Sequence, residues 1–376
     1  MQETETVAEI ARRLQATGYD IQHIGGGVVG VLANGEGPTV MFRADIDGLP
    51  VKESTGVPYA STKTAIDAAG NTVPLMHACG HDMHITAGLG AAELLSRGKD
   101  TWSGTYIALF QPGEETAQGA QSMVDDGLVD KIPKPDVALG QHVLSWPTAG
   151  KVATAPGPAL STGASFRVNV YGKGSHGSMP HLGVDAVVLA SSIVIRLQTI
   201  VARQLAPSEF GVVTVGSLQA GTKSNIIPDS ATMLMNIRAY DTGVRERLID
   251  GIERIVKAEC EAARSPREPE IEIFDSYPLT DNDAAVTEKI TAAFVDHFGA
   301  ERVEHLQPLP ASEDFSVIPT AFDIPYTYWG FGGFAEGQEA LPNHNPGFAP
   351  VIQPTLRTGT EAAVASVIAY LGSEEL

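Results

Sequence analysis

The chain has 376 residues, 43% hydrophobic and 19% charged, a composition typical of a soluble globular protein long enough for two domains. Its 45 acidic residues against 25 basic ones give a formal charge of -20, so nucleic-acid and membrane partners are not expected because such a surface repels phosphates and anionic lipids. We find no apolar run approaching a membrane span and no signal-peptide pattern, which predicts a cytoplasmic protein.

Strand-like and helix-like segments alternate through the first half of the chain. An amphipathic helix is expected within residues 1–18, and the residues after it have strand patterns. Strands are expected at 27–35, 38–50, 104–115 and 136–143, with helices at 84–98 and 119–129. This alternation predicts an α/β fold whose central sheet is mostly parallel and flanked by helices.

The pattern changes near residue 162. Four alternating strands and two long helices follow, at 163–174, 183–205, 209–221, 230–240, 243–263 and 269–277. This set indicates a compact α+β domain of ferredoxin-like type. The α/β pattern returns afterwards, so we expect a large catalytic domain from residues 1–161 and 275–376, interrupted by an inserted smaller domain at 162–274.

Residues 77–84 read HACGHDMH and contain the first candidate site. Cys79 and His81 flank Gly80, where the chain can bend tightly and turn both side chains toward one point. Thiolate and imidazole are both good ligands for zinc and related ions. Taken alone, the pair is equally compatible with a buried cysteine beside a surface histidine. Cys260, the second cysteine, lies in a helical pattern and is expected to be a buried thiol.

Two adjacent carboxylates, Glu114 and Glu115, follow the predicted strand at 104–115. They should lie at the carboxyl edge of the sheet, where sites of open α/β folds collect. One carboxylate can bind a metal while its neighbour acts as a general base. A solvated acidic turn is the alternative in so acidic a chain.

Two more histidines are candidates. His142 closes a predicted core strand, and His344 lies in a loop of Pro, Asn and Gly at 341–348. Alone, His142 would more often be an ordinary residue at the edge of the core. Together, the four segments offer five donors, one more than a tetrahedral zinc needs. They suit two metal ions about 3.5 Å apart that share a bridging group and a water.

These motifs resemble the co-catalytic metallopeptidase and amidohydrolase family that includes aminoacylases, hippurate hydrolase and plant indoleacetyl-amino-acid hydrolases. RADIDGLP at 43–50, GKGSHGSMPH at 172–181 and SNIIPD at 224–229 also match that family in the expected order. The resemblance covers nearly the whole chain. It departs at the N-terminus, where the family usually has an extra helix with a His-Pro-Glu turn, and we therefore expect a truncated start.

The resemblance implies a metal centre with two divalent ions, zinc first, with manganese, cobalt or nickel as alternatives. In it, Cys79 bridges the ions and Glu114 is the general base. The remaining ligands would be His81, Glu115, His142 and His344. Asp45 and Asp47 are expected near the site, either behind the ligands or in a capped turn. Asp82 would orient a ligand histidine or cap the following helix, and the role of His84 stays open.

The resemblance also gives the inserted domain a role as a lid and dimerisation domain. It implies that His176 stabilises an oxyanion, often from the partner subunit, and that Asn225 and Arg238 hold the substrate α-carboxylate. An arginine fork matches a carboxylate with two hydrogen bonds. Without the resemblance, these residues would be ordinary loop and strand residues. A homodimer or higher homo-oligomer is expected.

The sequence therefore predicts an aminoacylase-type, metal-dependent amidohydrolase that splits a small N-acyl amino acid into a carboxylic acid and a free amino acid. A dipeptidase or carboxypeptidase of the same fold is the first alternative. A metal-free thiol hydrolase with Cys79 as nucleophile is the second. A binding protein without turnover is the third, and the complete set of Glu114, Glu115 and the other donors argues against it.

Overall fold

The computed structural model describes residues 2–67 and 69–372 and divides the chain into two compact units. The large unit consists of Met1–Ala159, Thr280–Gln307 and Asp314–Leu376. The small unit consists of Leu160–Leu279 and Pro308–Glu313. The small unit thus includes a short segment from the last third of the chain as well as a central insertion.

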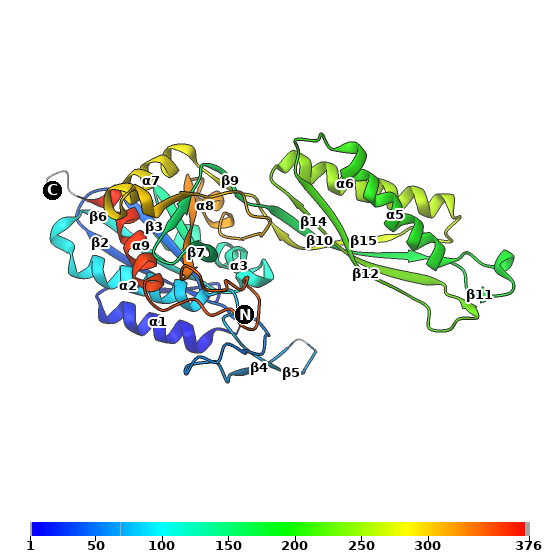
Figure 1. Cartoon of the computed structure of the whole chain (residues 1–376), viewed down its shortest axis with the longest axis horizontal. Coiled ribbons are helices and arrows are strands. Elements are labelled where there is room, and N and C mark those ends of the chain that lie inside the picture. The colour runs from blue at the N-terminus through cyan, green and yellow to red at the C-terminus, as the bar shows by residue number, and fades with distance from the viewer. Residues whose placement is uncertain (1, 68, 373–376) are drawn as a thin grey trace. The chain divides into compact units, whose positions relative to one another are not determined.

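An eight-stranded sheet forms the centre of the large unit (Figure 1). In spatial order its strands are β1 (Asp20–Ile24), β2 (Gly27–Asn34), β6 (Gly104–Gln111), β3 (Thr39–Asp45), β7 (Val137–Thr148), β18 (Tyr326–Phe334), β8 (Val152–Thr154) and β17 (Val303–His305). The four central strands β6, β3, β7 and β18 are mutually parallel. β3, β6 and β18 are almost wholly buried, and β7 is buried from Val137 to Gln141, as apolar parallel strands covered on both faces should be. The predicted α/β class with a mostly parallel central sheet is confirmed.

Helices cover this sheet, and α1, α2 and α9 lie side by side (Figure 1). The helices of the large unit are α1 (Thr4–Ala16), α2 (His81–Arg97), α3 (Gly119–Asp125), α4 (Leu128–Lys131), α7 (Ala284–Phe298), α8 (Val317–Phe322) and α9 (Thr355–Leu371). α1 buries only Val7, Ile10 and Leu14, the stripe expected of an amphipathic surface helix. Both α2 and α9 contact β3, which fixes the start of α2 at the sheet edge.

Short elements complete the large unit. They are β4 (Thr64–Ile66), β5 (Thr72–Pro74), β9 (Gly157–Leu160), β16 (Thr280–Asn282) and the 3-10 turns η1 (Lys99–Thr101), η2 (Glu114–Thr116) and η4 (Ala300–Arg302). β4 and β5 pair as an antiparallel hairpin, and β16 pairs with β9. Of these, η2 matters most for function because it carries the two adjacent glutamates.

The small unit has one antiparallel sheet with α5 and α6 packed against it and against each other. Its main elements are β10 (Thr162–Tyr171), α5 (Ala186–Gln204), β12 (Gly211–Ala220), β14 (Ser230–Ala239), α6 (Thr242–Ala262) and β15 (Glu270–Tyr277). The spatial order β12-β14-β10-β15 and the β-α-β-β-α-β sequence order are those of ferredoxin-like folds. A small pair, β11 (Ser175–His176) with β13 (Ile226–Ile227), and the turn η3 (Pro180–Leu182) complete the unit.

Helix α5 departs from one sequence expectation. Among the described residues it alone is long and apolar enough to cross a membrane by length and composition, with a mean hydropathy of 1.6. One such helix is weak evidence for a membrane span, because core helices of soluble proteins pass the same test. Asp185 caps its start by accepting from the N–H groups of Val187 and Val188. One side of α5 is buried, yet Val188 and Ile195 remain 60% and 73% exposed.

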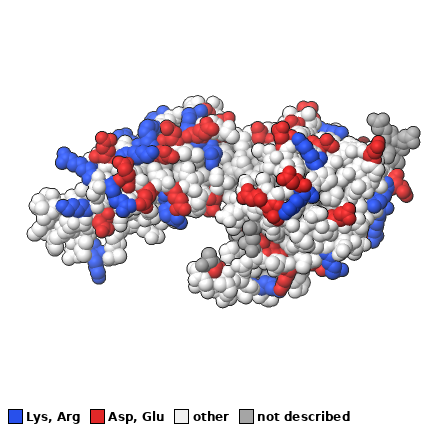
Figure 2. Space-filling view, turned by 180° about the vertical axis from the view of Figure 1, so that it is seen from behind, with Lys and Arg blue, Asp and Glu red and all other residues white. Residues whose placement is uncertain are grey.

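Charged side chains of both signs are interspersed over the face shown in Figure 2. On the helices of the large unit, some charged side chains pair one turn apart, such as Glu9 with Arg13 on α1 and Glu93 with Arg97 on α2. The acidic excess of the chain is therefore distributed over this face among basic residues.

Candidate metal centre

The carboxyl ends of neighbouring strands in the large unit bring polar side chains to one edge of the sheet. β3 ends at Asp45, and β6 ends at Gln111, just before Glu114 and Glu115. Asp45 and Gln111 are paired in register. His142 lies on β7, on the other side of β3. Because these strands are parallel, their carboxyl ends meet at the same edge.

Helix α2 begins at this edge, and Gly80 makes that start sterically feasible. Gly80 has a φ of +84°, in the left-handed region, and a Cβ there would lie 2.3 Å from Cγ1 of Val143. The resulting bend places Cys79 and His81 on either side of it, as expected from the sequence. Gly80 is also the N-cap, so Asp82 does not cap the helix but lies exposed in its first turn.

The five predicted ligands come together at this edge. The donor atoms of Cys79, Glu115 and His344 lie within 4.8 Å of one another. Sγ of Cys79 is 3.4 Å from Nε2 of His142, and Nε2 of His81 is 4.0 Å from Oε1 of Glu115. Oε1 of Glu115 is also 3.3 Å from Nε2 of His344. One thiolate, three imidazoles and one carboxylate thus surround a common space.

The donors fit a pair of divalent cations. Nε2 of His81 is buried and has no hydrogen-bond partner among the described residues, and the buried Oε1 of Glu115 faces the ring nitrogens of His344 and His81. Buried polar atoms are nearly always paired, so the unpaired Nε2 of His81 indicates a ligand in the space that it shares with Glu115. Thiolate, imidazole and carboxylate are the donors that zinc and similar ions prefer. The same edge that collects the side chains therefore has the chemistry of a metal centre.

Hydrogen bonds leave the Nε2 atoms of two histidines free for such ions. Nδ1 of His81 donates to Oδ1 and to the carbonyl oxygen of Asp47, at 3.0 and 3.1 Å. Nδ1 of His142 donates to the carbonyl oxygen of Val143 at 2.7 Å. Carbonyl oxygens only accept, so Nδ1 of each ring carries a proton and Nε2 is the nitrogen left to bind a metal ion. Oδ2 of Asp47 also accepts from the N–H of Glu115, which orients both ligands.

Electrostatic coupling within the cluster shifts several pKa values. Burial opposes ionisation of Cys79, but His142, His344 and His81 hold the pKa of its thiol well below the ordinary value. Hydrogen bonds to Cys79 and Glu115 raise the pKa of His344 to about 10. Burial raises the pKa of Glu115. Without metal, the site therefore holds a thiolate next to protonated imidazoles, and a metal ion must displace those protons.

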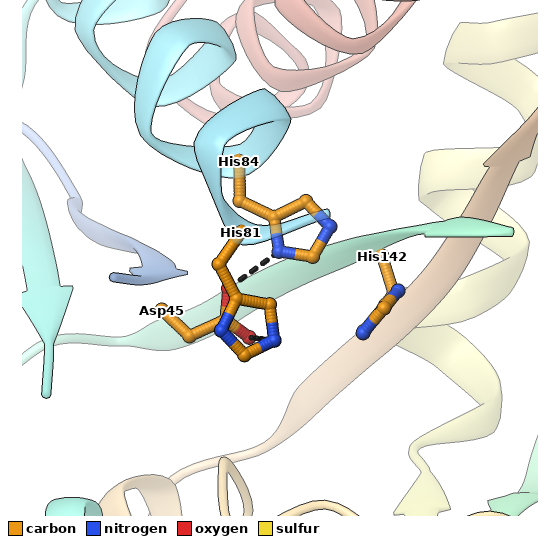
Figure 3. Close-up of side chains that lie close together, drawn as sticks. All are labelled: Asp45, His81, His84 and His142. Carbon is orange, nitrogen blue, oxygen red and sulfur yellow. Dashed lines mark hydrogen bonds and ion pairs between the residues drawn. The ribbon is translucent and has the colours of Figure 1, made fainter. Parts of the chain in front are cut away.

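Asp45 and His84 lie directly behind the ligands. Figure 3 shows His81 and His84 projecting from the first turn of α2 toward Asp45, with His142 approaching from β7. Nδ1 of His84 donates to Oδ1 of Asp45, and Nε2 of His84 accepts from the N–H of Val143 at 2.8 Å. Both nitrogens of His84 are therefore used within the protein, which resolves a role that the sequence left open.

A buried polar cluster next to Asp45 was not expected from the sequence. Arg43 is wholly buried, and it donates to Oδ2 of Asp45 at 2.7 Å and to Oε1 of Gln111 at 2.8 Å. Asp314 accepts from Gln111 at 2.6 Å and from Arg43 at 3.3 Å. An arginine inside an apolar strand was a readable signal, because a buried charge needs partners. Asp314 had no comparable signal.

Asn343 is another residue that sequence reasoning missed. Its Nδ2 donates to the carbonyl oxygens of Cys79 and Val143, at 3.0 and 3.3 Å. The N–H of His344 donates to the carbonyl oxygen of Ala78 at 2.7 Å. These bonds attach the loop of His344 to the ligand segment of α2. The position of Asn343 beside a candidate ligand was the available signal.

The remaining predicted residues belong to the small unit. His176 in β11 pairs with Ile226 in β13, and the N–H of Gly177 donates to the carbonyl oxygen of Asn225 at 2.8 Å. His176 and Asn225 are therefore neighbours.

Arg238 lies at the opposite end of the small unit's sheet and donates to Oγ of Ser312. Ser230 pairs with Tyr171 at the end that leads to β11, whereas Arg238 pairs with Gly163. At about 3.3 Å per residue, the stretch of β14 from Ser230 to Arg238 alone spans roughly 26 Å. The structure thus groups His176 with Asn225 and separates both from Arg238.

The hydrogen bonds of the exposed His176 ring show which of its nitrogens can donate. Its Nδ1 accepts from the N–H of Ser178 at 3.1 Å and lies 2.8 Å from Oγ of the same serine. A backbone N–H can only donate, so Nδ1 is bare and the neutral ring carries its proton on Nε2. This nitrogen is suited to donate to a developing negative charge.

Comparisons with known proteins agree with this geometry. The model of "Peptidase family M20/M25/M40" matches residues 41–368. The chain is 35% identical to a hippurate hydrolase of Campylobacter jejuni, over 91% of this chain and 85% of that protein. It is 33% identical to thermostable carboxypeptidase 2 of Saccharolobus solfataricus, over 98% of this chain and 91% of that protein. The structure also resembles a solved Bacillus subtilis protein described as a dinuclear metal binding peptidase from the M20 family. The TM-score is 0.78 at 26% identity, and the match covers 98% of this chain and 93% of that chain.

Proposed function

The chain belongs to peptidase family M20/M25/M40, and we propose that it is a dinuclear metal-dependent amidohydrolase that cleaves N-acyl amino acids into a carboxylic acid and a free amino acid. One observation carries this proposal, the convergence of five donors at one sheet edge with His81 Nε2 buried and without a hydrogen-bond partner among the described residues. Similarity to a hippurate hydrolase supports the substrate class.

Cys79 would bridge two divalent ions, with the other ligands from His81, Glu115, His142 and His344. When bound, such ions polarise an amide carbonyl and lower the pKa of a shared water. A thiolate with several imidazoles favours zinc, while manganese, cobalt and nickel remain the alternatives. Metal analysis of protein purified without chelators identifies the ion, and one equivalent per chain or less after reconstitution would contradict the dinuclear assignment.

Glu114 is the general base in this scheme. It is 6% exposed and belongs to a close group with His81 and Glu115, so it faces the space between the ligands. Its carboxylate takes a proton from the attacking water and delivers it to the leaving amine. His176 donates from Nε2 to the oxyanion of the tetrahedral intermediate, a role that its bond from Ser178 prepares.

The substrate α-carboxylate would be held by Arg238 and Asn225. These two residues lie at opposite ends of the small unit's sheet, so a single copy of that unit cannot offer both to one small substrate. We therefore assign Arg238 from one chain and the neighbouring pair His176 and Asn225 from a second chain to each site. This assignment makes the active form a homodimer or a higher homo-oligomer, with the small unit as lid and dimerisation domain.

The small unit offers a surface for such a second copy. Strand β12 is an edge strand of its sheet, and α5 exposes Val187, Val188 and Ile195. An open edge beside an apolar helix face is a natural place for symmetric pairing. Replacing Ile195 with Glu should give monomers in light scattering and abolish turnover, whereas Ile195→Leu should keep both the dimer and activity. A fully active monomer would contradict the shared site.

We also propose a cytoplasmic protein without nucleic-acid or membrane partners. The net charge of -20 opposes binding to phosphate backbones, and Figure 2 shows acidic and basic groups interspersed on the face that it displays. Cys79 and Cys260 are both free thiols, as is usual in reducing compartments. Cell fractionation with a tagged chain tests the location.

A carboxypeptidase or dipeptidase is the second candidate function. The 33% identity to a carboxypeptidase favours it, because the same groups could hold the terminal carboxylate of a peptide. The two functions differ in whether a charged amine or an uncharged acyl group lies on the other side of the scissile bond. A panel of N-acetyl, N-benzoyl and N-aminoacyl derivatives of one amino acid discriminates them. We expect the N-acyl compounds to have the higher kcat/KM.

The direct test of the mechanism is Glu114→Gln, which should keep both metal equivalents and lose roughly 100- to 10000-fold in kcat, the range of general acid–base contributions. The matched control is Glu36→Gln, an exposed carboxylate that should leave kcat unchanged. Near-normal turnover of Glu114→Gln would remove Glu114 from the mechanism. Activity that survives complete metal removal would instead favour a thiol hydrolase with Cys79 as nucleophile.

A further inference from the structure

The backbone of Val143 is held by side chains on the side of β7 where β3 no longer pairs with it. β3 pairs with β7 only as far as Gly140, so the later residues of β7 lack that neighbour. The N–H of Val143 donates instead to Nε2 of His84 at 2.8 Å. Its carbonyl oxygen accepts from Nδ1 of His142 at 2.7 Å and from Asn343 at 3.3 Å. His84 thus replaces a missing strand partner beside a metal ligand.

The hydrogen bonds of His84 determine which of its ring nitrogens carries the proton. A backbone N–H only donates, so Nε2 of His84 must be bare, and Nδ1 carries the proton that is given to Asp45. Neither nitrogen is left to bind a cation. Proximity alone would suggest otherwise, because Asp45, His81, His84 and His142 form one close group (Figure 3).

The carboxylate of Asp45 is held by Arg43 on the side away from His84. Arg43 donates to Oδ2 of Asp45 at 2.7 Å, and both side chains are fully buried. Gln111 holds the other side of the guanidinium group, at 2.8 Å from Arg43 Nε. The buried carboxylate is therefore charge-compensated and oriented, with Oδ1 aimed at His84.

We propose that Arg43, Asp45 and His84 form a relay that holds the Val143 backbone and, through its carbonyl oxygen, the ring of His142 with Nε2 turned toward Cys79. His84 is a positioning residue and not a metal ligand. The rings of His84 and His142 are also in T-shaped contact, with centroids 4.4 Å apart. This inference rests on the proposed role of His142 as a ligand.

The substitutions His84→Asn and His84→Gln distinguish the hydrogen bond of His84 to Val143 from its hydrogen bond to Asp45. Gln places an amide oxygen near the position of Nε2, where it can accept from Val143, whereas the shorter Asn reaches only toward Asp45. We expect His84→Asn to lower metal affinity by about 10- to 100-fold in chelator competition, the range for partners behind a ligand. His84→Gln should restore most of that loss, and exposed His23→Asn is the matched control. Equal affinity in wild type and His84→Asn, or equal loss with Asn and Gln, would overturn the relay.

A measurement on the unmodified holoprotein keeps the test independent of variant folding. Cadmium serves as a spin-active substitute for zinc in NMR of protein with nitrogen-labelled histidine. Metal–nitrogen couplings are expected from His81, His142 and His344 and not from His84. A coupling from His84 would show that it is a ligand and would overturn the relay while leaving the proposed function in place. The absence of every coupling, with no metal bound, would overturn the proposed function and the relay together.

Discussion

The two units of this protein present their functional histidines in opposite ways. In the large unit, His81, His84 and His142 are fixed by backbone carbonyls, buried carboxylates and a buried arginine. In the small unit, His176 is exposed, and the hydrogen bonds that orient it among the described residues come from Ser178 in its own turn. The comparison teaches that the candidate metal ligands are held in place by buried hydrogen bonds of the large unit, whereas His176 is presented on an exposed turn of the small unit.

The largest expected effect breaks the metal centre itself. Cys79→Ala should lower kcat/KM by more than ~100-fold, beyond the usual cost of losing a partner behind a ligand, because the bridging donor is removed. Cys260→Ala is the matched control, a buried thiol on α6 that should leave metal content and kcat/KM unchanged. Steady-state kinetics with metal analysis measures both. Comparable losses in the two variants would mean that Cys79 has no special role.

The second prediction concerns how much the buried network behind the ligands contributes to the stability of the large unit. Arg43→Met leaves the buried Asp45 without its charge partner and should destabilise the protein by about 3–5 kcal/mol in denaturant unfolding. Arg12→Met removes an ion pair on the surface of α1 and should barely move the transition. Similar stability of both variants would show that the network behind the ligands is not preorganised.

The third effect concerns the small unit. His176→Ala should reduce kcat by roughly 100- to 1000-fold, the cost of an oxyanion donor, with KM and metal content little changed. Ser178→Ala should have a smaller effect in the same direction, because the backbone N–H of residue 178 still orients the ring. A rise in KM without loss of kcat would place His176 in substrate binding instead.

The smallest effect is a graded dependence of metal binding on pH. The pKa of His344 is raised to about 10 by Cys79 and Glu115, so its imidazole is protonated at neutral pH when no metal is present. Metal binding must release that proton, and affinity should therefore rise with pH and continue to rise until about pH 10. Chelator competition across pH measures this slope. A flat profile would mean that no proton is displaced.

Much of the site could be predicted because its residues lie at the ends of predicted strands and in short motifs. The alternation of strands and helices put Glu114, Glu115 and His142 at one sheet edge, and Gly80 signalled the bend between Cys79 and His81. The resemblance to a known family then assigned roles to these residues. His344 was the exception, because its loop has no regular structure and only the motif around it pointed to a ligand.

The rest depended on contacts that no local pattern contains. The pairing of Arg43 with Asp314 joins residues far apart in the chain, and the state of His84 follows from the N–H of Val143. The strand expected at 136–143 ends too early. In the structure β7 continues to Thr148, since β18 still pairs with it there.

The central claim is that one edge of a single sheet holds two metal ions between Cys79, His81, Glu115, His142 and His344. Anomalous diffraction from crystals of the metal-loaded protein, recorded on both sides of the metal's absorption edge, tests it most directly. The account predicts two peaks per chain at that edge, one on each side of Cys79 Sγ. A single peak, or peaks bound elsewhere while these side chains contact only one another, would contradict it.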